Sequence, residues 1–129
     1  MLAGVGTDIL SIERMRLQIG SPAFMRRVFT SDEMDAGRRR ADQANYYAKL
    51  FAAKEAVFKC FGITADELGT WLNIEIKDSE EAHPEVRLFG LMADVARARK
   101  VERVLLSLSS DTDYAVAFAA VVGEGEHGG

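Results

Sequence analysis

The chain has 129 residues, of which 48% are hydrophobic and 28% are charged, as is typical of one globular domain with a modest core. No apolar run reaches the roughly 20 residues of a membrane-spanning helix, and the N-terminal MLAGVGTDIL lacks the basic segment of a signal peptide, so we expect a cytoplasmic protein without a membrane partner. The net charge of −4, without interleaved aromatic and basic residues, argues against a nucleic-acid partner.

The first predicted element is a short strand over residues 2–8, in which Gly4 and Gly6 allow another backbone to come close. Asp8 stands where this strand is expected to end. A carboxylate at a strand end is most often a turn or capping residue. Its position alone favours that interpretation over a role in a site.

Residues 11–41 predict three short helices, each announced by a capping residue. Ser11 caps the first and Ser21 the second. Thr30 and Glu33 have the spacing of a capping box, which opens the third.

The same part of the chain is basic, because residues 11–41 hold seven arginines and four acidic residues. We expect Arg14, Arg26 and Arg27 to point away from the buried faces of their helices. This distribution favours an acidic partner surface. A solvated arginine-rich face explains it equally well.

A long helix is predicted from residue 42 or 43 to Gly62. At a step of about 100° per residue, its apolar stripe comprises Tyr47, Leu50, Phe51, Phe58 and Phe61. Glu55 lies at the edge of this stripe, and Lys59 follows one turn later. Such a pair taken alone is most often an ordinary ion pair on a solvated face.

Three other features mark this helix. Its alanines, Ala48, Ala52 and Ala56, form a smooth flank where another backbone can come close. Lys54 is unusual because it falls near the middle of the apolar stripe. The single cysteine, Cys60, is expected to be a small core residue, which fits a reducing cytoplasm.

The second half of the chain alternates short strands and turns with one further helix. After a loop over 63–70, we predict a strand over 72–77, a polar turn ending at Pro84, a strand over 86–89, a helix over 91–100 with Leu91 and Val95 inward, and strands over 104–109 and 114–122. Residues 123–129 are expected to form a flexible tail.

The last strand, residues 114–122, is apolar on both faces, which is typical of a strand covered on both sides. In a domain this small, another subunit can supply one of the covers.

Taken together, the predicted helices and strands indicate an α+β fold. A small antiparallel sheet packs on one long central helix, with short helices beside it, in a single domain of residues 1–122.

Few chemistries are available to this set of residues. His83 and His127 are expected in a loop and in the tail, apart from the cysteine and from any Ser–Asp pair, which argues against triads and zinc sites. Mg²⁺ is typically held by one or two carboxylates, with water and phosphates in its other positions. Asp8 and Glu55 can supply that pair if they meet in the fold, and Lys59 would then face the same phosphates.

Five segments spread over nearly the full length carry a family resemblance. They are Gly4-Val5-Gly6-Thr7-Asp8-Ile9, Glu13-Arg14, Phe51-Ala52-Ala53-Lys54-Glu55-Ala56 followed by Lys59, Leu106-Ser107-Leu108-Ser109, and Tyr114-Ala115-Val116-Ala117. In this order and spacing they resemble the holo-acyl-carrier-protein synthase family, the small phosphopantetheinyl transferases.

The resemblance implies transfer of 4′-phosphopantetheine from coenzyme A to a serine of an apo acyl carrier protein, with release of adenosine 3′,5′-bisphosphate. It implies that Asp8 and Glu55 hold Mg²⁺ with the pyrophosphate of the coenzyme. It also implies that Lys59 binds phosphate. These three residues are the expected catalytic set.

Partners follow from the same resemblance. Arg14 is expected to face the acidic recognition helix of the carrier protein, and Arg26 and Arg27 are assigned to the same contact because they lie in the basic part of the chain. The family resemblance also implies a homotrimer with active sites between subunits, which would explain the apolar last strand.

Further coenzyme contacts are expected at Lys54, Pro84, Ser109 and Ser110. The chain departs from many family members at two positions near this set. Leu50 replaces an arginine, for which Lys49 or Lys54 is a possible substitute, and Ser110 replaces a histidine. These departures bear on coenzyme affinity and carrier preference, and they are compatible with an enzyme dedicated to a secondary-metabolite carrier.

Two questions stay open at this stage. The chain could be a non-catalytic relative that holds coenzyme A or a carrier protein, whereas a purely structural trimer would leave Asp8, Glu55 and Lys59 unexplained. The acceptor of the serine proton is also open. A metal-organised water is the first candidate and Asp111 the second.

Overall fold

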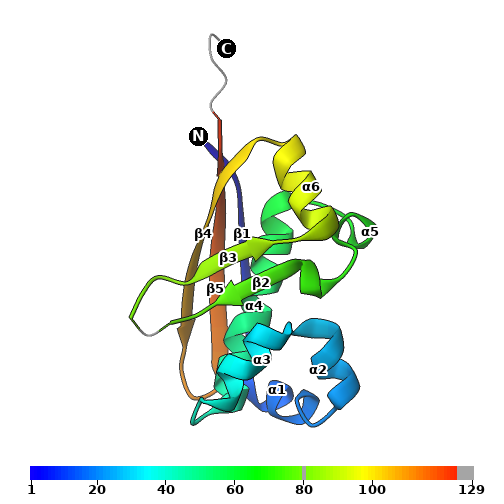
Figure 1. The fold of residues 1–129 in the computed structure, drawn as a ribbon. Helices are drawn as coiled ribbons and strands as arrows, with labels where there is room; N and C mark the ends of the chain where they lie inside the picture. The colour runs from blue at the N-terminus through cyan, green and yellow to red at the C-terminus, as the bar shows by residue number, and fades with distance from the viewer. Residues whose placement is uncertain (80, 125–129) are drawn as a thin grey trace.

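The structure is a computed structural model that describes residues 1–79 and 81–124. Its elements in chain order (Figure 1) are β1 (Leu2–Ser11), α1 (Ile12–Gln18), α2 (Pro22–Val28), α3 (Ser31–Arg38), α4 (Gln43–Phe61), α5 (Ala65–Leu68), the 3₁₀ turn η1 (Trp71–Asn73), β2 (Ile74–Lys77), β3 (Glu85–Leu88), α6 (Gly90–Ala98), β4 (Val101–Ser110) and β5 (Tyr114–Gly123). The predicted α+β class is confirmed. Among the described residues, no helix is both long and apolar enough to span a bilayer.

The helices begin and end where the sequence supplies capping groups. Ser11 accepts a hydrogen bond from the first turn of α1, and Thr30 with Glu33 forms the predicted capping box of α3. Asp42 caps α4, which ends at Gly62 with a left-handed φ of +60°. The predicted caps Ser11, Ser21 and Thr30 and the predicted helix end at Gly62 are confirmed, whereas the cap at Asp42 was not predicted.

The main sheet is antiparallel, with strand order β1-β5-β4. Strand β1 is longer than predicted, because its pairing with β5 continues from Asp8 opposite Ala117 to Ser11 opposite Tyr114. Asp8 is therefore part of the strand ladder and is neither a turn residue nor a cap. Strands β2 and β3 form a separate two-stranded sheet, so the single predicted sheet is in fact two.

Helix α4 lies between the two sheets and forms the centre of the core (Figure 1). A Cβ added at Gly6 would lie 2.2 Å from the carbonyl oxygen of Ala56, and one added at Gly4 would lie 2.2 Å from that of Cys60. The backbones of β1 and α4 are thus in direct contact, as the glycines and alanines predicted. Asp8 is two residues after Gly6 on the same face of the strand, so it is carried against α4.

Among the residues that the structure describes, strand β5 is covered on one side. Its inner alanines, Ala115, Ala117 and Ala119, are fully buried under α4. On the main sheet, the large apolar side chains that stay exposed are Leu2, Val5, Ile9, Leu105, Tyr114, Val116 and Phe118. The apolar outer face agrees with the two-sided pattern of the sequence, and its cover by another subunit stays a prediction.

The segment between α4 and β2 differs from the predicted loop and strand. A second capping box, formed by Thr64 and Glu67, opens the short helix α5. Thr70 then caps the turn η1. Because Trp71–Asn73 is coiled into that turn, β2 begins at Ile74 and not at residue 72.

The residue at the start of α6 that faces the core is Met92, one position later than predicted. Leu91, expected inside, is 51% exposed and lies over Gly69, whereas Met92 is fully buried. The helix starts at Gly90, whose φ of +53° is available to glycine at little cost. This backbone conformation at Gly90 sets which side chains of α6 face the core, and the apolar pattern alone does not show it.

The start of β1 and the end of β5 lie side by side at one end of the molecule (Figure 1). The N-terminal ammonium of Met1 donates to the carbonyl oxygen of Gly123 at 2.9 Å. Gly123 is the last residue of β5 and is buried, so the predicted tail cannot begin at this residue. Residues 125–129, including His127, lie outside the described residues.

Candidate active site

Three predicted residues meet where β1 packs against α4. The Lys59 ammonium lies 2.8 Å from Asp8 Oδ1 and also donates to the Thr7 carbonyl oxygen at 3.1 Å. Glu55 precedes Lys59 by one turn of α4, and its carboxyl group is close enough to that of Asp8 to be strongly affected by it. The fold therefore brings together two acids 47 positions apart in the chain.

The electrostatics of this cluster are unusual. Burial and the neighbouring Asp8 raise the pKa of Glu55 to about 7, although Lys59 opposes the shift. The pKa of Lys59 is raised chiefly by its hydrogen bond to Asp8. Two carboxylates that face each other with a single ammonium beside them lack one positive charge.

The donor set fits a hard divalent cation. While Glu55 is ionised, Asp8 Oδ2 is buried without a hydrogen-bond donor among the described residues, which is a costly state for a carboxylate oxygen. A protonated Glu55 would donate a hydrogen bond to Asp8, which is one reason why the pKa of Glu55 is raised. A cation between Asp8 and Glu55 would satisfy that atom and would favour the ionised form of Glu55, whose pKa is raised chiefly by burial and further by Asp8. The described residues contain no cluster of three or more His, Cys, Asp or Glu ligands. Two carboxylates with open positions suit Mg²⁺ better than zinc.

A cavity of about 240 Å³ opens beside this cluster. It is lined by residues of β1, α1 and α4, among them Ser11, Arg14, Phe51 and Glu55. Arg14 is exposed, and it lines the same cavity as Glu55, one member of the carboxylate pair. The structure thus places a predicted carrier contact next to the predicted metal site.

The other two predicted carrier contacts lie on α2. Arg26 and Arg27 are both exposed, and the Arg27 guanidinium lies 5.9 Å from the centre of the Phe24 ring. Neither lines the cavity beside Glu55. They extend the basic surface away from the candidate site.

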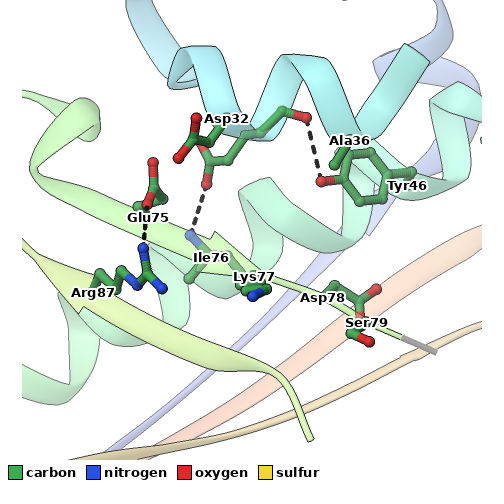
Figure 2. A pocket seen from close by; sticks show the side chains of 10 residues that line it. Asp32, Ala36, Tyr46, Glu75, Ile76, Lys77, Asp78, Ser79 and Arg87 are labelled. Atoms are coloured by element: carbon green, nitrogen blue, oxygen red, sulfur yellow. Dashed lines mark hydrogen bonds and ion pairs between the residues drawn. The ribbon is translucent and has the colours of Figure 1, made fainter. Parts of the chain in front are cut away.

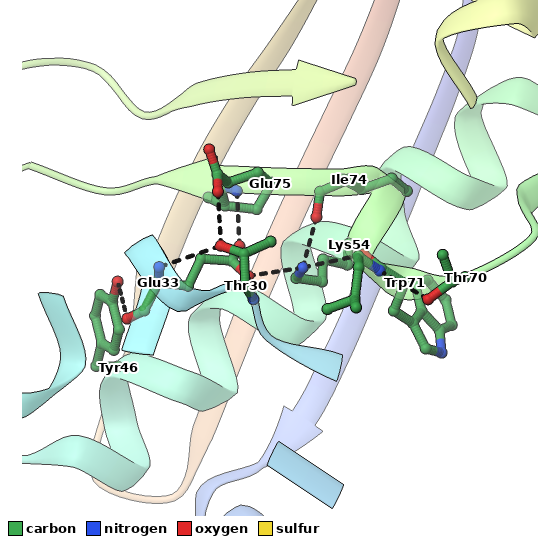
Figure 3. A network of polar contacts seen from close by, with 10 residues as sticks. Thr30, Glu33, Tyr46, Lys54, Thr70, Trp71, Ile74 and Glu75 are labelled. Carbon is green, nitrogen blue, oxygen red and sulfur yellow. Dashed lines mark hydrogen bonds and ion pairs between the residues drawn. The ribbon is translucent and has the colours of Figure 1, made fainter. Parts of the chain in front are cut away.

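Lys54 is not a coenzyme contact in this fold. Its side chain is fully buried and forms an ion pair at 2.8 Å with Glu33, which is also fully buried (Figure 3). It also donates to the carbonyl oxygens of Trp71 at 3.1 Å and Ile74 at 2.5 Å. An ammonium has three N–H donors, and all three are used here, so the expected contact with coenzyme A is wrong.

Lys49 and Leu50 are also not placed to bind a ligand. Leu50 is completely buried, so this position offers no contact to a molecule bound at the surface. Lys49 pairs with Asp78 at 3.3 Å. Neither lysine suggested as a substitute for the missing arginine is therefore free to replace it in this chain.

The remaining predicted coenzyme contacts do not join the carboxylate cluster within one chain. Pro84 and His83 line a cavity of about 500 Å³ along residues 104–108 of β4. Ser109 is exposed, and Ser110 Oγ donates to Asn45 Oδ1 at 3.2 Å near the start of α4.

Another cavity, of about 280 Å³, lies between α3, the start of α4 and the β2–β3 sheet (Figure 2). Two of its polar contacts lie within the cavity lining. Arg87 lies 4.0 Å from Glu75, and the Tyr46 hydroxyl donates to the Glu33 carbonyl oxygen at 3.3 Å. Acids outnumber cations in its lining, which does not suit a phosphate, and no predicted site residue lines this cavity.

Glu33 is the residue that sequence reasoning assigned too small a role. It was expected only to cap α3, and it is also the partner of Lys54. A signal existed, because a lysine in the middle of an apolar stripe needs an acidic partner if it is buried. The capping box hid that partner by giving Glu33 another explanation.

Comparison with known proteins decides the family. A family model described as the 4′-phosphopantetheinyl transferase superfamily matches residues 4–119. The chain belongs to this superfamily. As a phosphopantetheinyl transferase it is an enzyme, and Asp8, Glu55 and Lys59 all lie within the matched region.

Its similarity to individual phosphopantetheinyl transferases extends over almost the whole chain. It is 41% identical to a holo-[acyl-carrier-protein] synthase of Desulforudis audaxviator over 128 residues, or 98% of this chain and 97% of the relative. It resembles the solved Neisseria meningitidis synthase with a TM-score of 0.84 and 32% identity, covering 95% and 99% of the two chains. For the Helicobacter pylori synthase in complex with coenzyme A, the values are 0.77 and 25%, covering 92% and 99%.

Proposed function

We propose that this protein transfers 4′-phosphopantetheine from coenzyme A to a serine hydroxyl of an apo acyl carrier protein and releases adenosine 3′,5′-bisphosphate. The observation that carries the proposal is the meeting of Asp8, Glu55 and Lys59 at one accessible site. The printed name of the relatives supports the acceptor, and the Helicobacter pylori complex supports the donor.

Asp8 and Glu55 would hold Mg²⁺ together with the pyrophosphate of the coenzyme. When bound, the ion supplies positive charge that stabilises the leaving bisphosphate. The unpartnered Asp8 oxygen and the raised pKa of Glu55 support this assignment. Both carboxylates need to be ionised for it, so a cation and a proton compete for Glu55.

Lys59 would contribute a fixed positive charge to the phosphates. Its side chain is 53% exposed while its ammonium is anchored by Asp8 and the Thr7 carbonyl oxygen. In the reaction, a bond forms between the serine oxygen and phosphorus, and the bond between that phosphorus and the oxygen of the bisphosphate breaks. Phosphoryl-type transfer depends mainly on such positioning and charge neutralisation.

The serine proton also needs an acceptor, and Asp111 is a poor one. Its Oδ1 accepts hydrogen bonds from the backbone N–H groups of Asp113 and Tyr114 in the β4–β5 turn. These bonds lower the pKa of Asp111, which weakens it as a base. A water held near the carboxylate pair is the better candidate.

The carrier protein would dock on the exposed basic side chains near the cavity. Arg14 stands at that cavity, and Arg26 and Arg27 extend the positive surface along α2. An acidic helix on the carrier would complement this surface, and its serine would then reach the carboxylate pair.

The active unit is proposed to be a homotrimer. The exposed apolar outer face of the main sheet supports association, and Ser109 is separated from β1, which carries Asp8, by strand β5. Coenzyme contacts separated within one chain could then come from two neighbouring copies. Phe118→Asp should convert a species of three 14.2 kDa chains into monomers in sedimentation experiments and should abolish transfer. A wild-type monomer with full activity would contradict this part of the proposal.

The alternative is a relative that binds coenzyme A or a carrier protein without turnover. It is favoured by Leu50, which is buried where many relatives have arginine, and by Ser110, which bonds Asn45 where many have histidine. Incubation with coenzyme A, Mg²⁺ and fatty-acid or polyketide apo carriers, followed by intact-protein mass measurement, separates the two. Transfer predicts a mass increase equal to one phosphopantetheine group on the carrier. Coenzyme binding without any mass increase across the carrier panel would favour the alternative.

A further inference from the structure

The buried pair formed by Lys54 and Glu33 has no part in the proposed chemistry, yet Lys54 is directly next to Glu55 in the chain. The Lys54 ammonium is bound by Glu33 Oε1 and by the carbonyl oxygens of Trp71 and Ile74 (Figure 3). These three acceptors match its three donors. Lys54 therefore holds α4 to its surroundings by three directed bonds at one position.

Glu33 is held just as completely. Its Oε1 also accepts from the backbone N–H of Thr30 at 2.8 Å, and its Oε2 accepts from the N–H of Ile76 at 2.8 Å. The ion pair thus joins three parts of the chain: the start of α3, the segment η1–β2 and the middle of α4. Neither member can shift along the helix axis without breaking several bonds.

On the opposite side of α4, the directed contacts with β1 are more exposed or weaker. The exposed Lys59 ammonium donates to Asp8 Oδ1 and to the Thr7 carbonyl oxygen, and Cys60 Sγ donates to the Gly4 carbonyl oxygen at 3.6 Å. The rest of this contact is close and smooth, because Gly4 and Gly6 of β1 lie directly against the backbone of α4 and the buried alanines of β5 lie beneath it. Dispersion and burial hold such surfaces together but do so without directional preference. The fully buried bonds of Lys54 therefore oppose small rotations or translations of α4 more strongly than the solvent-screened pair of Lys59 does.

A rotation of α4 would act directly on the candidate site. Successive helix residues point about 100° apart, so fixing Lys54 toward η1–β2 also fixes Glu55 toward β1 and Asp8. A buried ion pair often adds little stability over an apolar pair of the same shape. Its directed bonds can nevertheless select one arrangement of the helix.

We propose that Lys54 is a positioning residue, and that its buried pair with Glu33 fixes the rotation and height of α4 so that Glu55 and Asp8 can hold one divalent cation. This inference rests on the proposed function, which assigns the cation to these two carboxylates. It gives Lys54 a role in the reaction without any contact to substrate.

The test compares a variant of the pair with a matched core variant. Lys54→Met combined with Glu33→Gln removes both charges together, so no uncompensated buried charge remains. Met92→Ala, at a fully buried position of α6, serves as the control for general destabilisation. Binding of Mn²⁺ in the presence of coenzyme A is measured by electron paramagnetic resonance, per folded molecule, alongside carrier modification at increasing Mg²⁺.

The inference predicts Mn²⁺ binding weaker by roughly tenfold in the double variant, the scale found when groups behind metal ligands are removed. Raising Mg²⁺ should restore much of the transfer rate, and the KM for the carrier protein should not change. The Met92→Ala control should keep wild-type Mn²⁺ affinity in its folded fraction.

Wild-type Mn²⁺ affinity in the folded double variant would overturn the inference and leave the proposed function standing. Failure of the wild-type protein to modify any carrier would instead overturn the proposed function, and the Mn²⁺ titration would still decide the role of Lys54. If the double variant does not fold, Glu33→Asp keeps both charges and shortens the acid by one methylene group. The same weakening of Mn²⁺ binding is expected from it, and its absence would also overturn the inference.

Discussion

Two lysines of α4 form ion pairs of the same length with very different surroundings. Lys54 and Glu33 are 2.8 Å apart, and both side chains are completely buried. Lys59 and Asp8 are also 2.8 Å apart, but Lys59 is 53% exposed and Asp8 is 10% exposed. The two lysines are only five positions apart on one helix.

The difference lies in what each pair leaves unsatisfied. Every donor of Lys54 and both oxygens of Glu33 have partners inside the protein. In the outer cluster, Asp8 Oδ2 has no partner among the described residues, and Glu55 stands beside it with a raised pKa. A pair that is complete holds the fold, whereas a cluster that is incomplete and accessible can accept a ligand.

The largest expected effect is the loss of transfer when the incomplete cluster is altered. Asp8→Ala or Glu55→Gln should lower the transfer rate by at least about a thousandfold, because metal stabilisation of a leaving phosphate amounts to several kcal/mol. The mass shift of an apo carrier measures it. Both variants should keep the wild-type melting temperature or exceed it in metal-free buffer. Full activity in both would rule out the metal assignment.

The next effect compares the two lysines directly by their free energies of unfolding. Lys54→Ala leaves Glu33 buried without its partner and should lower stability by about 3–5 kcal/mol. Lys59→Ala removes an exposed pair and should change stability by less than about 1 kcal/mol, while it reduces transfer strongly. Chemical denaturation of both variants measures the contrast. Equal losses of stability would show that exposure does not separate the two pairs.

A smaller effect is the pH dependence that Glu55 imposes on the metal-free protein. Its pKa is about 7 in the folded chain against an ordinary value of 4.5, so the folded state binds its proton more tightly than the unfolded state. Stability should fall as pH rises from about 4.5 to 7, by on the order of 2 kcal/mol, and then level off. Unfolding of wild type and Glu55→Gln at pH 5 and pH 8 isolates this contribution. The prediction fails if the variant shows the same fall.

The smallest effect is expected on the basic surface, outside both pairs. Arg14→Ala should raise the KM for the carrier by roughly fivefold, since a charged rim contact contributes about 1 kcal/mol and acts mainly on encounter. The same substitution should weaken the salt dependence of the KM. Steady-state kinetics at two ionic strengths measures both. An unchanged KM would exclude Arg14 from the carrier contact.

The cluster of Asp8, Glu55 and Lys59 could be predicted from the sequence for specific reasons. Gly4 and Gly6 predicted the close contact of strand and helix, and the spacing of Glu55 and Lys59 predicted a shared helix face. That contact brings Asp8 to the same place. These features depend on local periodicity and on steric size, which a sequence displays directly.

The buried pair of Lys54 and Glu33 could not be predicted from the sequence in the same way. Lys54 was expected to contact coenzyme A, because helical periodicity shows which side of the helix a residue lies on but not which residues pack against that side. The answer depended on Glu33 and on two carbonyl groups of η1–β2, which come together only in the tertiary structure. The one-residue turn of α6 was missed for a related reason, since Gly90 takes a conformation that apolar spacing does not encode.

The most direct test of the central claim is a titration of the metal-free protein with Mn²⁺ in the presence of coenzyme A, read by electron paramagnetic resonance. We predict one bound ion per active site in the wild type. Asp8→Asn and Glu55→Gln should each lose that ion, while Lys59→Ala should retain it. Unchanged Mn²⁺ binding in both carboxylate variants would contradict the claim that Asp8 and Glu55 hold the cation.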